Sequence, residues 1–149
     1  MRIYLDLCCL KRPFDLQDQP LVRLQTEAVL SILELAEQDA QLLRSEAMAL
    51  ENSLNPVQSR RDAVALWIGA GSMGVYTEAE LAARTDAMQE RGFKGFDAFH
   101  LACAELADAD VFLTVDVPLQ KVAARVSAEL SFRVLDPVHL VEEISTWKH

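Results

Sequence analysis

The sequence predicts a three-layer α/β/α domain in which a mostly parallel sheet of four or five strands lies between two layers of helices. Short apolar segments rich in β-branched and aromatic residues alternate with longer segments whose apolar residues recur at helical spacing. This alternation is typical of parallel strands joined by right-handed helical crossovers. The chain has 149 residues and is 51% hydrophobic, so residues 1–149 are expected to form a single domain with a substantial core.

The first half of the chain begins with a strand and ends in helices. β-Branched and aromatic residues open the first strand, and a polar loop with Pro13 and Pro20 follows it. Ser45 is placed to cap a helix, which Asn55-Pro56 ends or bends. The predicted elements are a strand at 3–10, a helix at 21–37, a strand at 41–44, and helices at 45–54 and 60–68.

The second half continues the alternation after the glycine-rich segment GAGSMG, residues 69–74. Thr77 is a good N-cap for an amphipathic helix that Gly92 stops. Asp136 and Pro137 form a suitable N-cap and first-turn pair for the last helix. The predicted elements are helices at 77–92 and 97–107, a strand at 111–115, a helix at 117–126, a strand at 131–135 and a helix at 137–145.

Charge and composition limit the kinds of partner. The net charge of −9 argues against a general electrostatic grip on nucleic acid, although bound divalent ions can invert the local sign of an acidic pocket. No apolar run approaches the ~18 residues of a membrane span, and no signal-peptide pattern opens the chain. We therefore expect a cytoplasmic protein without membrane contact. The three cysteines, Cys8, Cys9 and Cys103, lack metal-binding spacing and are expected to be reduced and buried.

Four carboxylates fall at the edge of the sheet where such folds bind ligands, the carboxyl ends of the strands. Asp6 lies toward the end of the first strand, and Asp116 follows the strand at 111–115. Asp97 begins a helix that starts from the same edge if a crossover feeds it there. Glu51 lies about two turns into the helix that follows the second strand, so its side chain can reach back over that edge. The sequence thus predicts that four distant segments bring acids to one pocket.

Hydroxyl groups accompany two of these acids. Thr114 is two residues before Asp116, so its hydroxyl points to the same side of the strand and could orient an Asp116 oxygen or a water. The Ser45 hydroxyl could orient Glu51 or a water in the same way, although a role as an ordinary helix N-cap explains Ser45 at least as well. From the residues alone, Glu51 is equally well an exposed helical glutamate, and Glu46 competes for its role.

Several other polar residues have simpler explanations. Asp110 precedes its strand and should lie at the opposite edge of the sheet, and Asp136 is explained as an N-cap. His100, three residues after Asp97, could touch substrate or tune the site, but a packed helical histidine is the favoured interpretation. GAGSMG matches a dinucleotide-binding pattern only by spacing, since it follows a helix, and a loop between helices accounts for it better.

Converging carboxylates predict a metal ion. Several ionised acids cannot share a partly buried pocket unless a cation joins them. Ligand sets made only of oxygen select hard ions, Mg²⁺ or Mn²⁺. Such ions typically activate water against a phosphodiester and stabilise the leaving oxygen.

The ordered motifs resemble the PIN-domain family of metal-dependent ribonucleases, which includes VapC-type toxins. The resemblance runs over nearly the whole chain, and its parts come in the family's order. The matching motifs are IYLD with Asp6, SEAMALE with Ser45 and Glu51, GFDAFHLACAE with Asp97, and FLTVD with Thr114 and Asp116. After Asp6 the chain departs from the family, with Leu7, Cys8 and Cys9 where Ser, Thr or Asn is frequent.

The resemblance implies an endoribonuclease that cuts RNA with Mg²⁺ or Mn²⁺ held by Asp6, Glu51, Asp97 and Asp116, with Thr114 assisting. It further implies a homodimer and, for a toxin, a small antitoxin protein. Phosphate contacts would come from basic residues, for which the candidates are Lys11, Arg12, Arg60, Arg61, Arg91 and Lys94.

Two other classes of function fit the same scaffold. A catalytically silent binding module with an acidic pocket is favoured by the unusual residues after Asp6 and by the net charge. A phosphoacceptor domain of receiver type would need paired acids beside the first strand and a positioned lysine, neither of which is evident. A phosphatase of the dehalogenase type would need a second aspartate where Cys8 stands.

Overall fold

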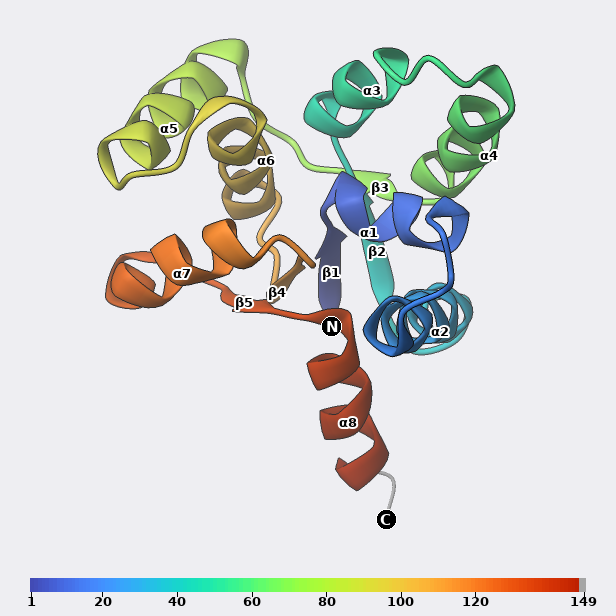
Figure 1. The fold of residues 1–149 in the computed structure, drawn as a ribbon. Helices are drawn as coiled ribbons and strands as arrows, with labels where there is room; N and C mark the ends of the chain where they lie inside the picture. Colours follow the sequence, from blue (N-terminus) through green and yellow to red (C-terminus); the bar gives the residue numbers. More distant parts are fainter. Residues whose placement is uncertain (148–149) are drawn as a thin grey trace.

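A computed structural model describes residues 1–147, which form a five-stranded parallel sheet between two layers of helices (Figure 1). The strand order is β3-β2-β1-β4-β5, and every adjacent pair is parallel. β1 therefore lies at the centre, where Ile3 pairs with both Leu42 of β2 and Val111 of β4. The predicted three-layer α/β/α class is confirmed.

The elements follow the alternation expected from the sequence. The strands are β1 (Arg2–Leu5), β2 (Gln41–Arg44), β3 (Ser72–Met73), β4 (Val111–Leu113) and β5 (Arg133–Leu135). The α-helices are α1 (Leu7–Lys11), α2 (Pro20–Leu35), α3 (Glu46–Ser53), α4 (Gln58–Gly69), α5 (Glu78–Glu90), α6 (Gly95–Leu106), α7 (Val117–Arg125) and α8 (Pro137–Trp147). Short 3₁₀ turns cover Arg12–Phe14 and Ser127–Glu129.

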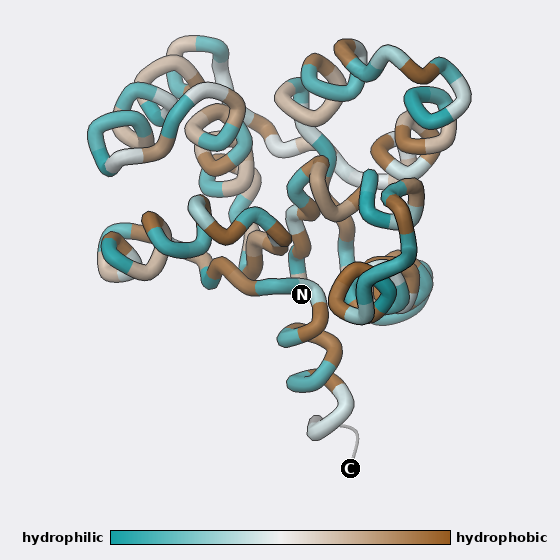
Figure 2. Tube along the Cα trace, in the orientation of Figure 1, coloured by the Kyte–Doolittle hydropathy of each residue, from teal (hydrophilic) through white to brown (hydrophobic). Residues whose placement is uncertain are grey.

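Side-chain alternation along the strands divides the core into two layers. Tyr4 and Phe112 stack on the face covered by α3, α5, α6 and α7, with ring centroids 5.2 Å apart. Ile3, Leu5 and Leu113 point to the other face, against α1, α2, α4 and α8. The hydropathy of the trace shows the same arrangement, with apolar strands between helices that are polar on their outer sides (Figure 2).

The first strand is shorter than predicted. It ends at Leu5, and Asp6 takes an extended conformation and caps α1 by accepting a hydrogen bond from the Leu7 amide. The apolar residues after Asp6 are buried because α1 packs against one face of the sheet, and not because the strand continues. A short buried helix and a buried strand have the same apolar composition, so the pattern alone could not separate them.

The glycine-rich segment contains a strand that the sequence did not predict. Ser72 and Met73 pair with Leu43 and Arg44 and form the sheet edge, where a loop between helices was expected. A Cβ at Gly71 would lie 2.9 Å from the backbone carbon of Leu43, so a glycine is required for this approach.

Helix starts are set largely by the residues that the sequence indicated. Thr77 forms a capping box with Glu80, Ser45 caps α3, and Asp136 accepts a hydrogen bond from the Val138 amide at 2.8 Å. Among residues 1–147, no helix combines the length and apolar character needed to cross a membrane.

Candidate metal centre

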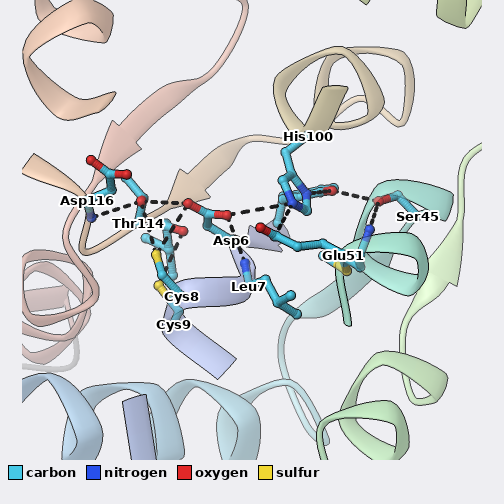
Figure 3. Close-up of polar contacts among 12 residues, drawn as sticks. Asp6, Leu7, Cys8, Cys9, Ser45, Glu51, His100, Thr114 and Asp116 are labelled. Carbon is cyan, nitrogen blue, oxygen red and sulfur yellow. Dashed lines mark hydrogen bonds and ion pairs between the residues drawn. The ribbon is translucent and has the colours of Figure 1, made fainter. Parts of the chain in front are cut away.

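Asp6 is fixed at the end of the central strand. The residue is only 5% exposed, and its side chain accepts hydrogen bonds from the Leu7 amide and the Thr114 hydroxyl, each at 2.8 Å (Figure 3). A buried carboxylate is costly unless donors or cations compensate for its lost hydration. Because β1 and β4 are neighbours, the residues that follow them meet at one edge, where Asp6 was predicted to lie.

Thr114 serves a different acid from the one expected. Its hydroxyl oxygen accepts from the Asp116 amide at 3.1 Å, and its proton is directed to Asp6 Oδ2. The sequence had suggested an Asp116 oxygen or a water as its partner. The hydroxyl is fully buried, so Thr114 links the ends of β1 and β4.

Glu51 reaches the centre from α3 and meets His100 of α6. Its Oε1 lies 2.9 Å from His100 Nε2, and the same nitrogen lies 3.9 Å from Asp6 Oδ1. His100 is completely buried, as a packed helical histidine would be, but it contacts two of the predicted acids. The sequence had favoured a packed histidine, and these contacts were not predicted; the one signal was the position of His100 one helical turn after Asp97.

A buried hydrogen-bond chain extends behind His100. Its Nδ1 lies 2.6 Å from the Tyr4 hydroxyl, which lies 2.6 Å from Ser45 Oγ, and Ser45 Oγ accepts from the Met48 amide at 3.2 Å. Ionised carboxylates only accept hydrogen bonds, so a neutral His100 carries its proton on Nε2. Tyr4 then donates to Nδ1 and accepts from Ser45, and each proton of the chain has one acceptor.

Asp97 and Asp116 come from the starts of two helices, α6 and α7. Asp97 lies in the first turn of α6, where burial and then the charges of Asp6 and Asp116 raise its pKa to about 6. Asp116 caps α7 by accepting from the Leu119 amide at 3.1 Å. The repulsion felt by Asp97 indicates that these carboxylates share one electrostatic environment.

The tightest potential ligand set differs from the predicted one. Asp6, Glu51 and His100 each offer a ligand atom, and these atoms lie within 4.8 Å of one another, so the group could hold a metal ion. Asp97 and Asp116 do not belong to this group. The donor set fits a divalent cation because it joins two carboxylates and an imidazole from three elements, beside an Asp97 whose pKa is raised by burial and by neighbouring acids.

The remaining acids occupy the positions that simpler explanations gave them. Asp110 accepts from the Arg2 amide at 2.7 Å, at the start of the central strand and thus at the opposite edge. Glu46 accepts a hydrogen bond from Tyr76 and lies 3.6 Å from the Cys103 sulfur, so it does not compete for the role of Glu51.

The cysteines are free, as expected, but one of them adjoins the centre. Cys9 and Cys103 are buried, and burial is the main cause that raises the pKa of both thiols. Cys8 is only half-buried, and its sulfur lies 3.3 Å from Asp6 Oδ2 and 3.4 Å from Thr114 Oγ1. Its thiol thus contacts both the carboxylate of Asp6 and the hydroxyl that holds it.

The basic candidates divide into paired and unpaired groups. Arg12 pairs with Asp15 at 3.0 Å and Arg91 with Glu105 at 3.6 Å. Arg61 donates to the Asn55 carbonyl at 2.7 Å. The unpaired ones within residues 1–147 are Lys11, Arg60 and Lys94.

A scan of the chain against models of known protein families finds no match, and a search of curated proteins finds no relative. The family resemblance therefore rests on the sequence motifs and remains a prediction.

Proposed function

We propose that this chain is a Mg²⁺- or Mn²⁺-dependent endoribonuclease. The observation that carries the proposal is the convergence of the Asp6 and Glu51 carboxylates around His100, within 4.8 Å of one another, beside an Asp97 whose pKa is raised by burial and by neighbouring carboxylates. Such a concentration of negative charge at the ligand-binding edge of a parallel sheet favours a cation. The choice of RNA as the substrate is supported by the ordered sequence motifs, which resemble those of the PIN-domain ribonucleases.

The protein's own groups would have distinct tasks. Asp6 would be a fixed ligand, because the Leu7 amide and the Thr114 hydroxyl hold its two oxygens. Glu51 would be aimed by His100 Nε2, and Asp97 and Asp116 would complete the oxygen donors. A bound divalent cation would lower the pKa of a water and stabilise the charge that develops on the phosphodiester oxygens.

The orientation of His100 favours a hard ion. When Nε2 donates its proton to Glu51, it has no lone pair for a metal, so the available ligands are carboxylate oxygens. Oxygen donors select Mg²⁺ or Mn²⁺ over softer ions. His100 then acts as a positioning residue for Glu51.

Cleavage of a mixed RNA pool with Mn²⁺ tests the proposal directly. We expect wild-type protein to cut the pool, the Asp97→Asn variant to lose cleavage, and EDTA to abolish it. The matched control is Asp110→Asn, which removes the same charge at the opposite edge of the sheet and should cut like wild type. Equal cleavage by wild type and Asp97→Asn would reject the proposal, and metal binding without any cleavage would favour a binding module.

The homodimer and the antitoxin belong to the same proposal. Analytical ultracentrifugation of the purified chain tests the dimer. Co-expression with the product of the adjacent gene tests the antitoxin, which should form a stoichiometric complex with the chain and suppress cleavage.

A further inference from the structure

A cavity of about 460 Å³ adjoins the candidate metal centre and shares Glu51 with it. Its walls come from α1 and the turn after it, from the segment between α3 and α4, and from the start of α6. The volume falls in the range of cavities that bind small ligands, roughly 300–1,000 Å³. A ligand there would extend directly from the acidic centre.

The cavity carries cations in a protein that is acidic overall. Lys11 and Arg60 both line it, and within residues 1–147 no carboxylate lies within 4.0 Å of either charged group. The other acid in the wall, Asp15, is paired with Arg12. Two cations are thus free to bind an anion beside Glu51, although the chain has a net charge of −9.

Aromatic and amide groups complete the lining. Phe14 and Phe96 both line the cavity, and Asn55 adds an amide from the segment between α3 and α4. Phe14 packs against Trp67, with ring centroids 5.8 Å apart, and Phe96 lies 6.3 Å from the His100 ring, so both rings rest on ordered neighbours. Aromatic rings beside unpaired cations are the combination with which proteins bind single-stranded nucleic acid.

We propose that this cavity binds one nucleotide of a single-stranded RNA, next to the phosphodiester held at the candidate metal centre. Lys11 and Arg60 contact backbone phosphates, and Phe96 stacks on the base. The strand must be single, because a base that is stacked and paired in a duplex cannot also stack on an aromatic ring that lines a cavity. This inference rests on the proposed function for the neighbouring phosphodiester, whereas the binding of the nucleotide stands on the cavity itself.

Binding without cleavage tests the cavity. The probe is a fluorescein-labelled 12-nucleotide RNA of mixed sequence, titrated by anisotropy with the Asp97→Asn protein in Mg²⁺. The test variant adds Lys11→Gln and Arg60→Gln, and the matched control adds Lys121→Gln and Arg125→Gln, two exposed cations of α7 outside the cavity. Thermal melts of all proteins verify that they are folded.

We expect the cavity variant to bind about tenfold more weakly and the control to bind like its parent. The slope of log K against log[salt] should fall by about 1.4 in the cavity variant, since each phosphate contact on a single strand contributes about 0.7. Phe96→Leu should weaken binding by roughly fivefold or more without changing that slope, because stacking is not electrostatic. A 12-base-pair RNA duplex should bind at least tenfold more weakly than the single strand.

The inference is overturned if the cavity variant and the control bind alike, if duplex binds as well as single strand, or if the parent binds no RNA. These outcomes can be distinguished from a failure of the proposed function. Wild-type protein that cuts RNA while the cavity variant binds normally would reject only the cavity. Protein that binds through Lys11 and Arg60 but never cuts would reject only the nuclease.

Discussion

The two halves of the candidate metal centre are held in different ways, and Figure 3 shows the hydrogen bonds around Asp6, Glu51 and Asp116. In the hydrogen-bonded half, Asp6 and Glu51 each accept from fixed donors, among them Thr114 and His100. In the open half, Asp116 has one oxygen bonded to the Leu119 amide, and within residues 1–147 no donor reaches the Asp97 carboxylate. The protein's own donors therefore organise the first half, whereas the second half carries charge that they leave uncompensated.

Loss of a carboxylate from either half should have the largest effect, on cleavage. We expect Asp6→Asn and Asp116→Asn each to reduce the cleavage rate by roughly 10³-fold, since a bound cation contributes several kcal/mol to transition-state stabilisation. Single-turnover cleavage of a labelled RNA measures this loss. If only Asp6→Asn lost activity, the open half would have no part in the site.

His100→Ala should break the hydrogen-bonded half. The change removes the acceptor of the buried Tyr4 hydroxyl proton and opens a cavity, so the free energy of unfolding should fall by about 2–4 kcal/mol. Mn²⁺ affinity should fall by roughly 10- to 100-fold, because Glu51 loses the group that orients it.

Urea unfolding and calorimetric titration with Mn²⁺ measure the two effects of His100→Ala. The control is His139→Ala, which alters an exposed histidine of α8 and should change neither quantity. Unchanged Mn²⁺ affinity in a folded His100→Ala protein would show that Glu51 needs no such support.

Asp97→Asn should change the free energy of unfolding by an amount that depends on pH, because it removes a charge from the open half. The pKa of Asp97 rises from 3.8 to about 6 on folding, so between these values the folded protein binds more protons than the unfolded chain. The protonated Asp97 carboxyl therefore contributes to folding stability at low pH, and this contribution is lost as the pH rises through this window. The asparagine keeps the neutral form and should stabilise metal-free protein by about 1 kcal/mol at pH 8, after allowance for solvent screening, and by nothing at pH 3.5.

Urea titrations in EDTA across this pH range measure the effect of Asp97→Asn. Saturating Mn²⁺ should reverse the order, with wild type becoming the more stable protein. A stabilisation that is the same at pH 3.5 and pH 8 would contradict the electrostatic account.

Cys8→Ser should have the smallest effect, although its sulfur touches Asp6. A thiol is a weak donor, and Asp6 keeps the Leu7 amide and the Thr114 hydroxyl. We expect a change in unfolding free energy of about 0.5 kcal/mol or less and cleavage within about twofold of wild type. A much larger loss would assign Cys8 a role in holding Asp6.

The sequence predicted the parallel fold and the edge at which the acids meet, for reasons that are local. Helical spacing, N-caps such as Thr77 and the apolar strands are visible in short windows, and the strand-edge rule then separates Asp6 from Asp110. It did not predict where β1 ends or that Ser72–Met73 joins the sheet. Both depend on packing between distant segments, such as the approach of Gly71 to Leu43.

The hydrogen bonds of the site were harder to foresee than its acids. Tyr4 lies within the first strand and Ser45 caps a helix, and neither position suggests a link to His100. The link requires the register of β1 and the orientation of α6, which are properties of the assembled layers. Thr114 was identified as a site residue, but its hydroxyl donates to Asp6, which follows the neighbouring strand, and not to Asp116, which follows its own strand.

The central position of β1 has a consequence for synthesis of the protein. Thr114, which holds Asp6 in place, follows it by 108 positions, and β1 lacks one of its two neighbours until β4 has been made. Contacts between residues so far apart in the sequence form late in folding, because closing the long loop between them first costs conformational entropy. A chain still emerging from the ribosome would therefore display Asp6 and Glu51 without a finished centre.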